Sequence, residues 1–229
     1  MPSPTFVTEY ETVWNTTTSP KTVSVTVGAA TDVLVVCAMV GDSGSTLTTP
    51  TGGTGVSWTL QRSFTTASFC SIYLWTATGI SPQTFTLSVA QITSSIAYGF
   101  NCLQFSNAAV GASNVGSSTS GAPTLNLTTT ATGSAIVVIN GDWDALDGST
   151  GGATPRAWRT NAGTLTEQTY SNTGVGTGYA TYIGFHANAG AVGTYAVGLT
   201  VPSTQKYSIV ACEVLGNPPV TATTAWFTA

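Results

Sequence analysis

The sequence predicts an all-β chain that folds as an antiparallel, jelly-roll-like β-sandwich. Its apolar segments are short, rich in Val, Ile, Thr, Tyr and Phe, and separated by clusters of Gly, Ser, Asn and Pro. Several segments alternate apolar and polar residues with a period of two, as Thr22–Val27 does, which is typical of a half-buried strand. Patterns typical of helices are almost missing. A chain of 229 residues can bury about 70–75% of its unfolded surface, so a large sandwich needs no disulfides.

The expected strands form two series along the chain. The first series is Phe6–Val13, Thr22–Val27, Val33–Val40, Ser57–Gln61, Phe69–Ala77, Gln83–Val89 and Ile96–Phe105. The second series is Thr124–Thr128, Ser134–Asn140, Ala157–Arg159, Thr164–Tyr170, Gly178–His186, Gly193–Leu199 and Tyr207–Leu215.

The two series resemble each other in order and spacing. The matching pairs are Val33–Val36 with Ile136–Ile139, Trp58 with Trp158, Phe69–Ala77 with Ala180–Ala187, Phe85–Val89 with Tyr195–Leu199, and Cys102–Asn107 with Cys212–Asn217. An almost constant offset predicts a duplicated strand series, with half-repeats at about 22–107 and 124–216. Chance similarity among Val-, Thr- and Gly-rich strands is the alternative.

Two half-repeats could form two small domains or one. We expect a single domain over residues 1–216, because interleaving both strand sets in one double sheet leaves fewer exposed edges. The Gly-, Ser- and Ala-rich segment Asn107–Pro123 is expected to join the halves. Residues 217–229 begin with two prolines, which cannot continue a sheet, and contain Trp226 and Phe227. We expect this segment to be an arm that docks on its own subunit or on a neighbour.

Low charge restricts the classes of partner. Charged residues make up 6% of the chain, against roughly 25% in ordinary soluble domains. Five Lys and Arg against nine Asp and Glu form no basic patch, so neither nucleic acid nor an anionic membrane surface is an expected partner. No apolar run is long enough to span a membrane. Protein neighbours and sugars remain as partners, with a secreted protein in a polar coat as the alternative.

The N-terminus and the cysteines bear on the compartment. Met1–Pro4 lacks the basic and apolar regions of a signal peptide, so we expect a protein that is made and used without export, with a leader that is missing from this sequence as the alternative. Cys37, Cys70, Cys102 and Cys212 lie in apolar strand-like segments without zinc-ligand spacing. They are expected to be buried thiols, with two disulfides as the alternative.

Three acidic side chains lie close together directly after the strand that is expected to end at Asn140. Asp142, Asp144 and Asp147 could ligate a hard cation such as Ca²⁺, or they could form a solvated turn. No other cofactor is expected. A glycoside hydrolase would need two carboxylates across a cleft, for which Asp42 or Glu213 are the proposals. His186 is the only histidine, and no GxSxG motif is present, so we expect no catalytic residues.

The aromatic residues divide into two groups. Rings inside apolar strands, such as those of Tyr73 and Trp75, are expected in the core. Trp143, Trp158 and Tyr170 lie in or beside Gly/Thr-rich loops, where an exposed ring could stack on a sugar or fill a partner's pocket. Together with Trp226 and Phe227, they are the candidate residues for contact with a partner or a glycan.

Residues 6–216 resemble the Ser/Thr/Gly-rich β-sandwich structural proteins of tailed bacteriophages that infect actinobacteria, of the minor tail or capsid-decoration type. The resemblance rests on the order of Thr31–Val36, Pro50–Gly53 with Trp58, Tyr73–Ala77 and Phe85–Val89, followed by a weaker second pass that ends at Gly216. It implies a part of the virion without catalytic residues.

We therefore expect a non-enzymatic structural protein of a virion, from the tail tip, the baseplate or the capsid decoration. It would act as a homo-oligomer in contact with other virion proteins, and it could also attach to a glycan on the host surface. One rival is a carbohydrate-binding adhesin or secreted lectin-like module, which predicts a row of exposed aromatic rings. The other is a secreted hydrolase, which predicts two carboxylates, or His186 and a nucleophile, in one cleft.

Overall fold

A computed structural model gives the fold of the chain, and it contains strands and no helix over the residues it describes. The described residues are 3–14, 16–41, 45–65, 70–92, 96–143, 148–149, 154–173 and 178–217, without the side chain of Trp143. Within these ranges, no helix is long and apolar enough to cross a membrane. The prediction of an all-β chain is confirmed.

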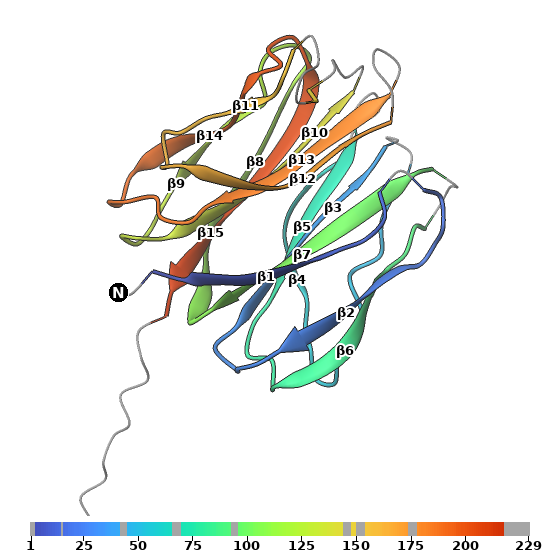
Figure 1. Cartoon of the computed structure of the whole chain (residues 1–229), viewed down its shortest axis with the longest axis vertical. Helices are drawn as coiled ribbons and strands as arrows, with labels where there is room; N and C mark the ends of the chain where they lie inside the picture. The colour runs from blue at the N-terminus through green and yellow to red at the C-terminus, as the bar shows by residue number, and fades with distance from the viewer. Residues whose placement is uncertain are drawn as a thin grey trace, which may run out of the picture.

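Two five-stranded antiparallel sheets form the middle of the molecule (Figure 1). The first central sheet has the order β1 (Thr5–Glu11), β7 (Tyr98–Ser106), β3 (Val33–Val40), β5 (Ser71–Ala77) and β4 (Thr59–Phe64). The second central sheet has the order β12 (Leu165–Asn172), β13 (Tyr179–His186), β10 (Ala135–Trp143), β15 (Lys206–Gly216) and β8 (Ala108–Ser118).

A smaller sheet covers the outer face of each central sheet. The first outer sheet consists of β2 (Lys21–Val27) and β6 (Gln83–Val89). The second outer sheet has the order β11 (Ala157–Trp158), β14 (Thr194–Val201) and β9 (Thr124–Thr128). The result is a sandwich of four layers, in which the central strands are buried on both faces.

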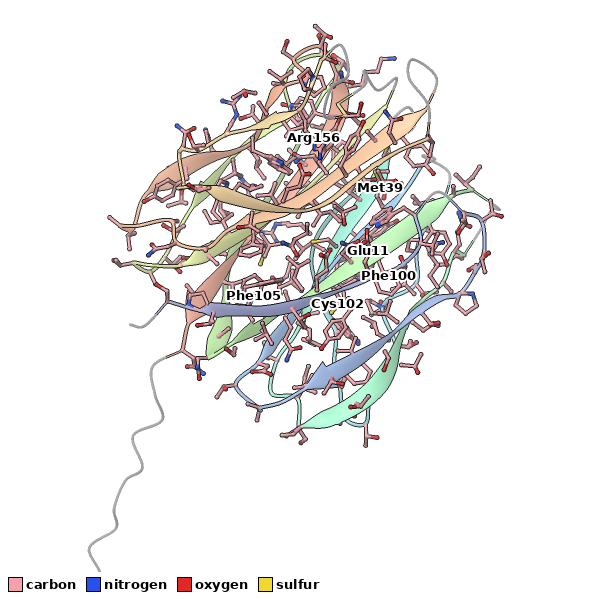
Figure 2. The ribbon with its side chains drawn as sticks, viewed as in Figure 1. Glu11, Met39, Phe100, Cys102, Phe105 and Arg156 are labelled. Carbon is pink, nitrogen blue, oxygen red and sulfur yellow. The ribbon has the colours of Figure 1, made fainter. Side chains whose placement is uncertain are left out.

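This layering explains why the central strands have continuous apolar sequences. In β3 every residue is buried. Val33, Val35, Cys37 and Met39 face the cluster between the two central sheets, whereas the residues between them face the first outer sheet. Phe105 lies in the same middle cluster (Figure 2). A strand with one solvent-facing side would have alternated instead.

The two halves of the chain build their sheets in the same order. Read from β1, the first central sheet runs β1-β7-β3-β5-β4, and the second runs β8-β15-β10-β13-β12. The outer pairs β2-β6 and β9-β14 also correspond. The strands that carry the similar sequence segments, such as β3 and β10 or β7 and β15, occupy corresponding positions. Each described sheet takes its strands from one half only, so the interleaving expected for a jelly roll does not occur.

One strand was missed in the sequence. The segment expected to join the halves contains β8, which pairs with β15 from Gly216↔Ala108 to Tyr207↔Ser118. Its small residues have weak strand propensity, but small size is what this position needs. A side chain at Gly111 would meet Glu213 Oε2 at 2.4 Å. Tertiary packing here outweighs local propensity.

The close approach of Trp14 to Gly99 gives a first testable prediction. A Cβ atom at position 99 would meet the indole of Trp14 at 2.4 Å, and Trp14 Nε1 donates a hydrogen bond to Asn101 Oδ1 at 2.9 Å. Gly99→Ala should therefore lower the free energy of unfolding by about 1–3 kcal/mol, as overpacking does. Urea denaturation measures this. Gly28→Ala is the matched control, since nothing lies within 4 Å of its Cβ position, and an equal loss there would contradict the steric explanation.

Candidate functional site

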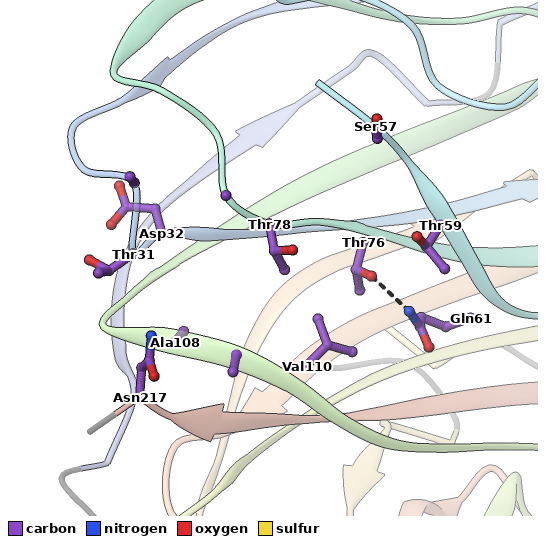
Figure 3. Close-up of a pocket in the computed structure, with 13 residues that line it drawn as sticks. Thr31, Asp32, Ser57, Thr59, Gln61, Thr76, Thr78, Ala108, Val110 and Asn217 are labelled. Carbon is purple, nitrogen blue, oxygen red and sulfur yellow. Dashed lines mark hydrogen bonds between the residues drawn. The ribbon is translucent and has the colours of Figure 1, made fainter. Parts of the chain in front are cut away.

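The strands β4 and β8 place an open hollow at one edge of the sandwich (Figure 3). They are the edge strands of the two central sheets, and between them lies a hollow of about 490 Å³, which we call the edge hollow. Its lining residues are Ala30, Thr31, Asp32, Ser57, Thr59, Gln61, Thr76, Thr78, Gly79, Ala108, Ala109, Val110 and Asn217.

The lining is polar because the inward face of β5 changes character along the strand. Ile72 and Leu74 face the middle core, and the next residues at the same spacing of two are Thr76 and Thr78, which line the hollow. Gln61 Nε2 donates a hydrogen bond to Thr76 Oγ1 at 2.8 Å (Figure 3). The apolar interface therefore ends in hydroxyl and amide groups. This change of residue type is a sequence signal for the hollow that was missed.

Among the described residues that line the edge hollow, Asp32 alone is charged, and its carboxylate is engaged within the fold. Asp32 is buried, and its Oδ2 accepts hydrogen bonds from the backbone N–H of Gly28 and Ala29 at 3.2 and 3.3 Å and from Gln104 Nε2 at 2.7 Å. The hollow thus offers neutral hydroxyl, amide and methyl groups. Such a lining suits an uncharged ligand rich in hydrogen-bonding groups, and it supplies no acid–base pair.

Three residues singled out in the sequence meet elsewhere, around Tyr182 of β13. The ring of Tyr182 lies 6.5 Å from that of Trp158 and 5.3 Å from that of Tyr170. Asp142 faces the same layer between the second central and second outer sheets, and its ionised form raises the pKa of Tyr182 further, after burial. Tyr182 was not predicted as a site residue, because nothing in the neighbouring sequence marks it as the centre of this cluster.

The expected position of Asp142 in a loop is wrong. Strand β10 continues to Trp143 because its pairing with β13 and β15 extends past Asn140. The side chain of Asp142 is buried, and its Oδ1 accepts a hydrogen bond from Ala180 N at 3.2 Å. The hydroxyl of Tyr182 also interacts with this carboxylate. Burial raises the pKa of Asp142 to about 7.

The other residues of the proposed metal site, Asp144 and Asp147, lie outside the described residues, as do Asp42, Trp226 and Phe227. Trp143 ends β10, and its side chain is outside the described part as well. Over the described ranges, no group of three or more His, Cys, Asp or Glu residues is arranged to hold a metal ion.

Trp158 and Tyr170 are half-buried, and both are engaged in contacts within the chain. Trp158 Nε1 donates a hydrogen bond to Glu167 Oε2 at 2.7 Å. Arg156 makes a two-pronged ion pair with the same carboxylate, with Nε to Oε2 at 2.6 Å and Nη2 to Oε1 at 2.5 Å. The Arg156 guanidinium also lies 4.3 Å from the ring centre of Tyr170. These contacts hold Arg156 in place, and its guanidinium covers one face of the Tyr170 ring.

A second, shallower hollow lies at the opposite edge, where β1 meets β12. Glu11, Thr12, Val13, Trp14, Tyr170 and Ser171 line about 450 Å³ there. Thr169 Oγ1 lies 2.9 Å from Glu11 Oε1 and 3.4 Å from Glu9 Oε1. Burial and the charge of Glu11 raise the pKa of Glu9. Hydrogen bonds lower it, but the net shift is upward. This carboxylate pair was not predicted as a site, because its partner Thr169 is far away along the chain.

The two remaining catalytic candidates hold structure together. Glu213 is buried and accepts hydrogen bonds from three backbone amides and two hydroxyl groups. His186 is buried, its Nδ1 lies 3.0 Å from Gly163 O, and burial lowers its pKa. Both residues lie beside Ile136 of β10. His186 is its partner on β13, and Glu213 is its partner on β15.

The four cysteines are free thiols and are buried. Burial raises their pKa, in Cys212 to about 12, and the reactive form is the thiolate. We therefore expect a water-soluble disulfide reagent to modify none of them in the folded protein within minutes, and all four in guanidinium. Absorbance of the released thiol counts them, and rapid modification of any thiol in the folded protein would contradict this burial.

Comparison of the chain with protein-family models, curated protein sequences and solved structures found no match.

Proposed function

We propose that the chain is a non-enzymatic structural component of a tailed-bacteriophage virion, from the tail tip, the baseplate or the capsid decoration, and that it acts through contacts between subunits. The observation that carries the proposal is the use of its few carboxylates. Asp32, Glu167 and Glu213 are each held by several donors of the fold. Groups fixed in this way stabilise a rigid scaffold, and they are poorly placed to exchange protons with a substrate.

The surface supports the same proposal. With 6% charged residues, a free monomer has little charge repulsion to keep it from associating. The described edge strands β4 and β8 also lie beside a neutral hollow rather than beneath a covering element. A protein of this kind is suited to a fixed place among neighbours.

Purified phage particles provide the test. Particles banded in a density gradient should contain the chain in a constant ratio to the major capsid protein, measured by quantitative mass spectrometry. The ratio should persist after a high-salt wash, because a neutral interface depends little on ionic strength. Loss of the chain from intact particles in the gradient would contradict the proposal.

Contact with a glycan on the host surface is the second candidate, and the hollow at the β1–β12 edge favours it. Glu11 is exposed there, and the hydroxyl-bearing residues Thr12 and Ser171 line the same space. Binding of the full chain to immobilised glycans should then be lost on Glu11→Gln and kept on Thr166→Ser, a change at an exposed residue outside this lining. Equal binding by both variants would contradict a role for this hollow.

A further inference from the structure

The edge hollow lies beside β4, which is the edge strand of the first central sheet as the structure describes it. Among the described strands, β4 pairs only with β5, through Thr59↔Thr76 to Phe64↔Ile72. Its other edge faces the hollow and β8. A free strand edge offers backbone N–H and C=O groups that another extended segment can pair with.

The described part of the chain ends at the rim of this hollow. Asn217 is one of its lining residues and ends the described part of the chain. Its backbone N–H donates a hydrogen bond to Asn107 O at 2.7 Å, which holds Asn217 in place. The sequence continues as Pro218-Pro219-Val220-Thr221-Ala222-Thr223-Thr224-Ala225-Trp226-Phe227-Thr228-Ala229.

We propose that residues 220–229 of a second copy of this chain bind along β4 and fill the edge hollow. The chemistry of the two sides agrees. The segment has no charged side chain and is rich in Thr and Ala, and the hollow is lined by hydroxyl, amide and methyl groups around a carboxylate that is already engaged. The segment has backbone N–H groups from Val220 onward, so it can pair with β4, whereas the two prolines before it cannot.

The occupant is a second copy rather than the same chain, because the sequence at the rim disfavours a tight reversal. Such a turn would place Pro218 and Pro219 at its two central positions, and proline at the second of these is incompatible with the common trans turns. In an extended state, ten residues reach about 33 Å, which is enough to cross to a neighbouring subunit. This inference rests on the proposed function, since it names the surface through which the subunits make contact.

The oligomeric state of the full chain tests the proposal. Native mass spectrometry over a concentration series should show a defined homo-oligomer, and deletion of residues 218–229 should give a monomer. Thr59→Arg and Thr78→Arg place a charge in the hollow at exposed positions. Each should weaken self-association by on the order of tenfold or more, because the arginine must lose water on docking without gaining a partner. Thr166→Arg, at an exposed position on β12, is the matched control and should associate normally.

A cross-linking measurement separates the two possible sources of the occupant. A photoreactive phenylalanine analogue at position 227 should cross-link to β4 or β8 of another copy, shown by mixing isotopically light and heavy chains. Cross-links only within one chain, a monomeric full chain, or an oligomer that neither the deletion nor the arginine variants weaken would each overturn the inference. The last result, with the chain still present in particles, would leave the proposed virion role standing and reject only this surface.

Discussion

Glu213→Ala should lower the free energy of unfolding by about 3–5 kcal/mol, because it orphans several donors at once. The Glu213 carboxylate accepts from the backbone N–H groups of Ala112 (3.0 Å), Thr130 (2.8 Å) and Ala131 (3.2 Å). It also accepts from the hydroxyls of Thr130 (2.8 Å) and Ser134 (2.7 Å). This one side chain therefore connects β15 to β8 and to the turn before β10. Guanidinium denaturation measures the loss.

The variant Glu213→Gln keeps the shape of the side chain and removes its charge. Its amide oxygen can keep part of the hydrogen bonding, so the loss should be smaller than for alanine. Burial raises the pKa of Glu213, but the hydrogen bonds lower it more, and the net shift is downward. The ionised form therefore adds stability above the usual pKa of 4.5, and this contribution disappears as the pH falls through the lowered value. Glu213→Gln should not show this loss of stability at acidic pH. If its stability falls with pH as that of the wild type does, Glu213 is not the responsible group.

Asp142→Asn should remove a pH dependence of opposite sign. Burial raises the pKa of Asp142 from 3.8 to about 7, so the folded state holds a proton that the unfolded state releases. Between these two pH values the contribution of Asp142 to the stability of the wild-type chain falls as the pH rises, by about 4 kcal/mol at roughly 1.4 kcal/mol per pKa unit. Asparagine can still accept from Ala180 N. The variant should therefore be more stable than wild type at pH 8 and nearly equal at pH 4.

Urea denaturation at a series of pH values measures this difference. Tyr182→Phe is a useful companion, because it removes the hydroxyl that shares the buried space with Asp142 and keeps the ring. It should leave the direction of the pH dependence unchanged. Parallel stability profiles for wild type and Asp142→Asn from pH 4 to 8 would show that Asp142 is not the responsible group.

The strands were predicted well wherever local pattern and position in the sheet agree. Val33–Val40 and Gln83–Val89 have the predicted bounds. Strand β8 was missed because its Gly, Ala and Ser residues gain their strand conformation only from pairing with β15. The end of β10 was placed too early for the same reason, since partners about 40 and 65 residues away extend it.

For the candidate sites too, the chemistry of single residues was predicted from the sequence and their tertiary contacts were not. Asp142, Trp158 and Tyr170 were singled out for their chemistry, and they share one cluster. Their surroundings were not foreseen, because the central Tyr182 lies on β13 and Glu167 of β12 meets Trp158 of β11 only in the folded chain. Asp144, Asp147, Trp226 and Phe227 stay predictions. The edge hollow depends on how two sheet edges separate in space, and its local sign in the sequence was the change from Ile72 and Leu74 to Thr76 and Thr78.

The equal strand order of the two halves has a consequence for how the molecule holds together. Each half alone would expose one broad apolar face, made by alternate residues of its central strands such as Val35 in one half and Val137 in the other. The chain is therefore built like a dimer whose two subunits are joined covalently. The link keeps each face at high effective concentration near the other, so the middle layer forms at any dilution. The free sheet edges, and not the faces, then remain for contacts with other molecules.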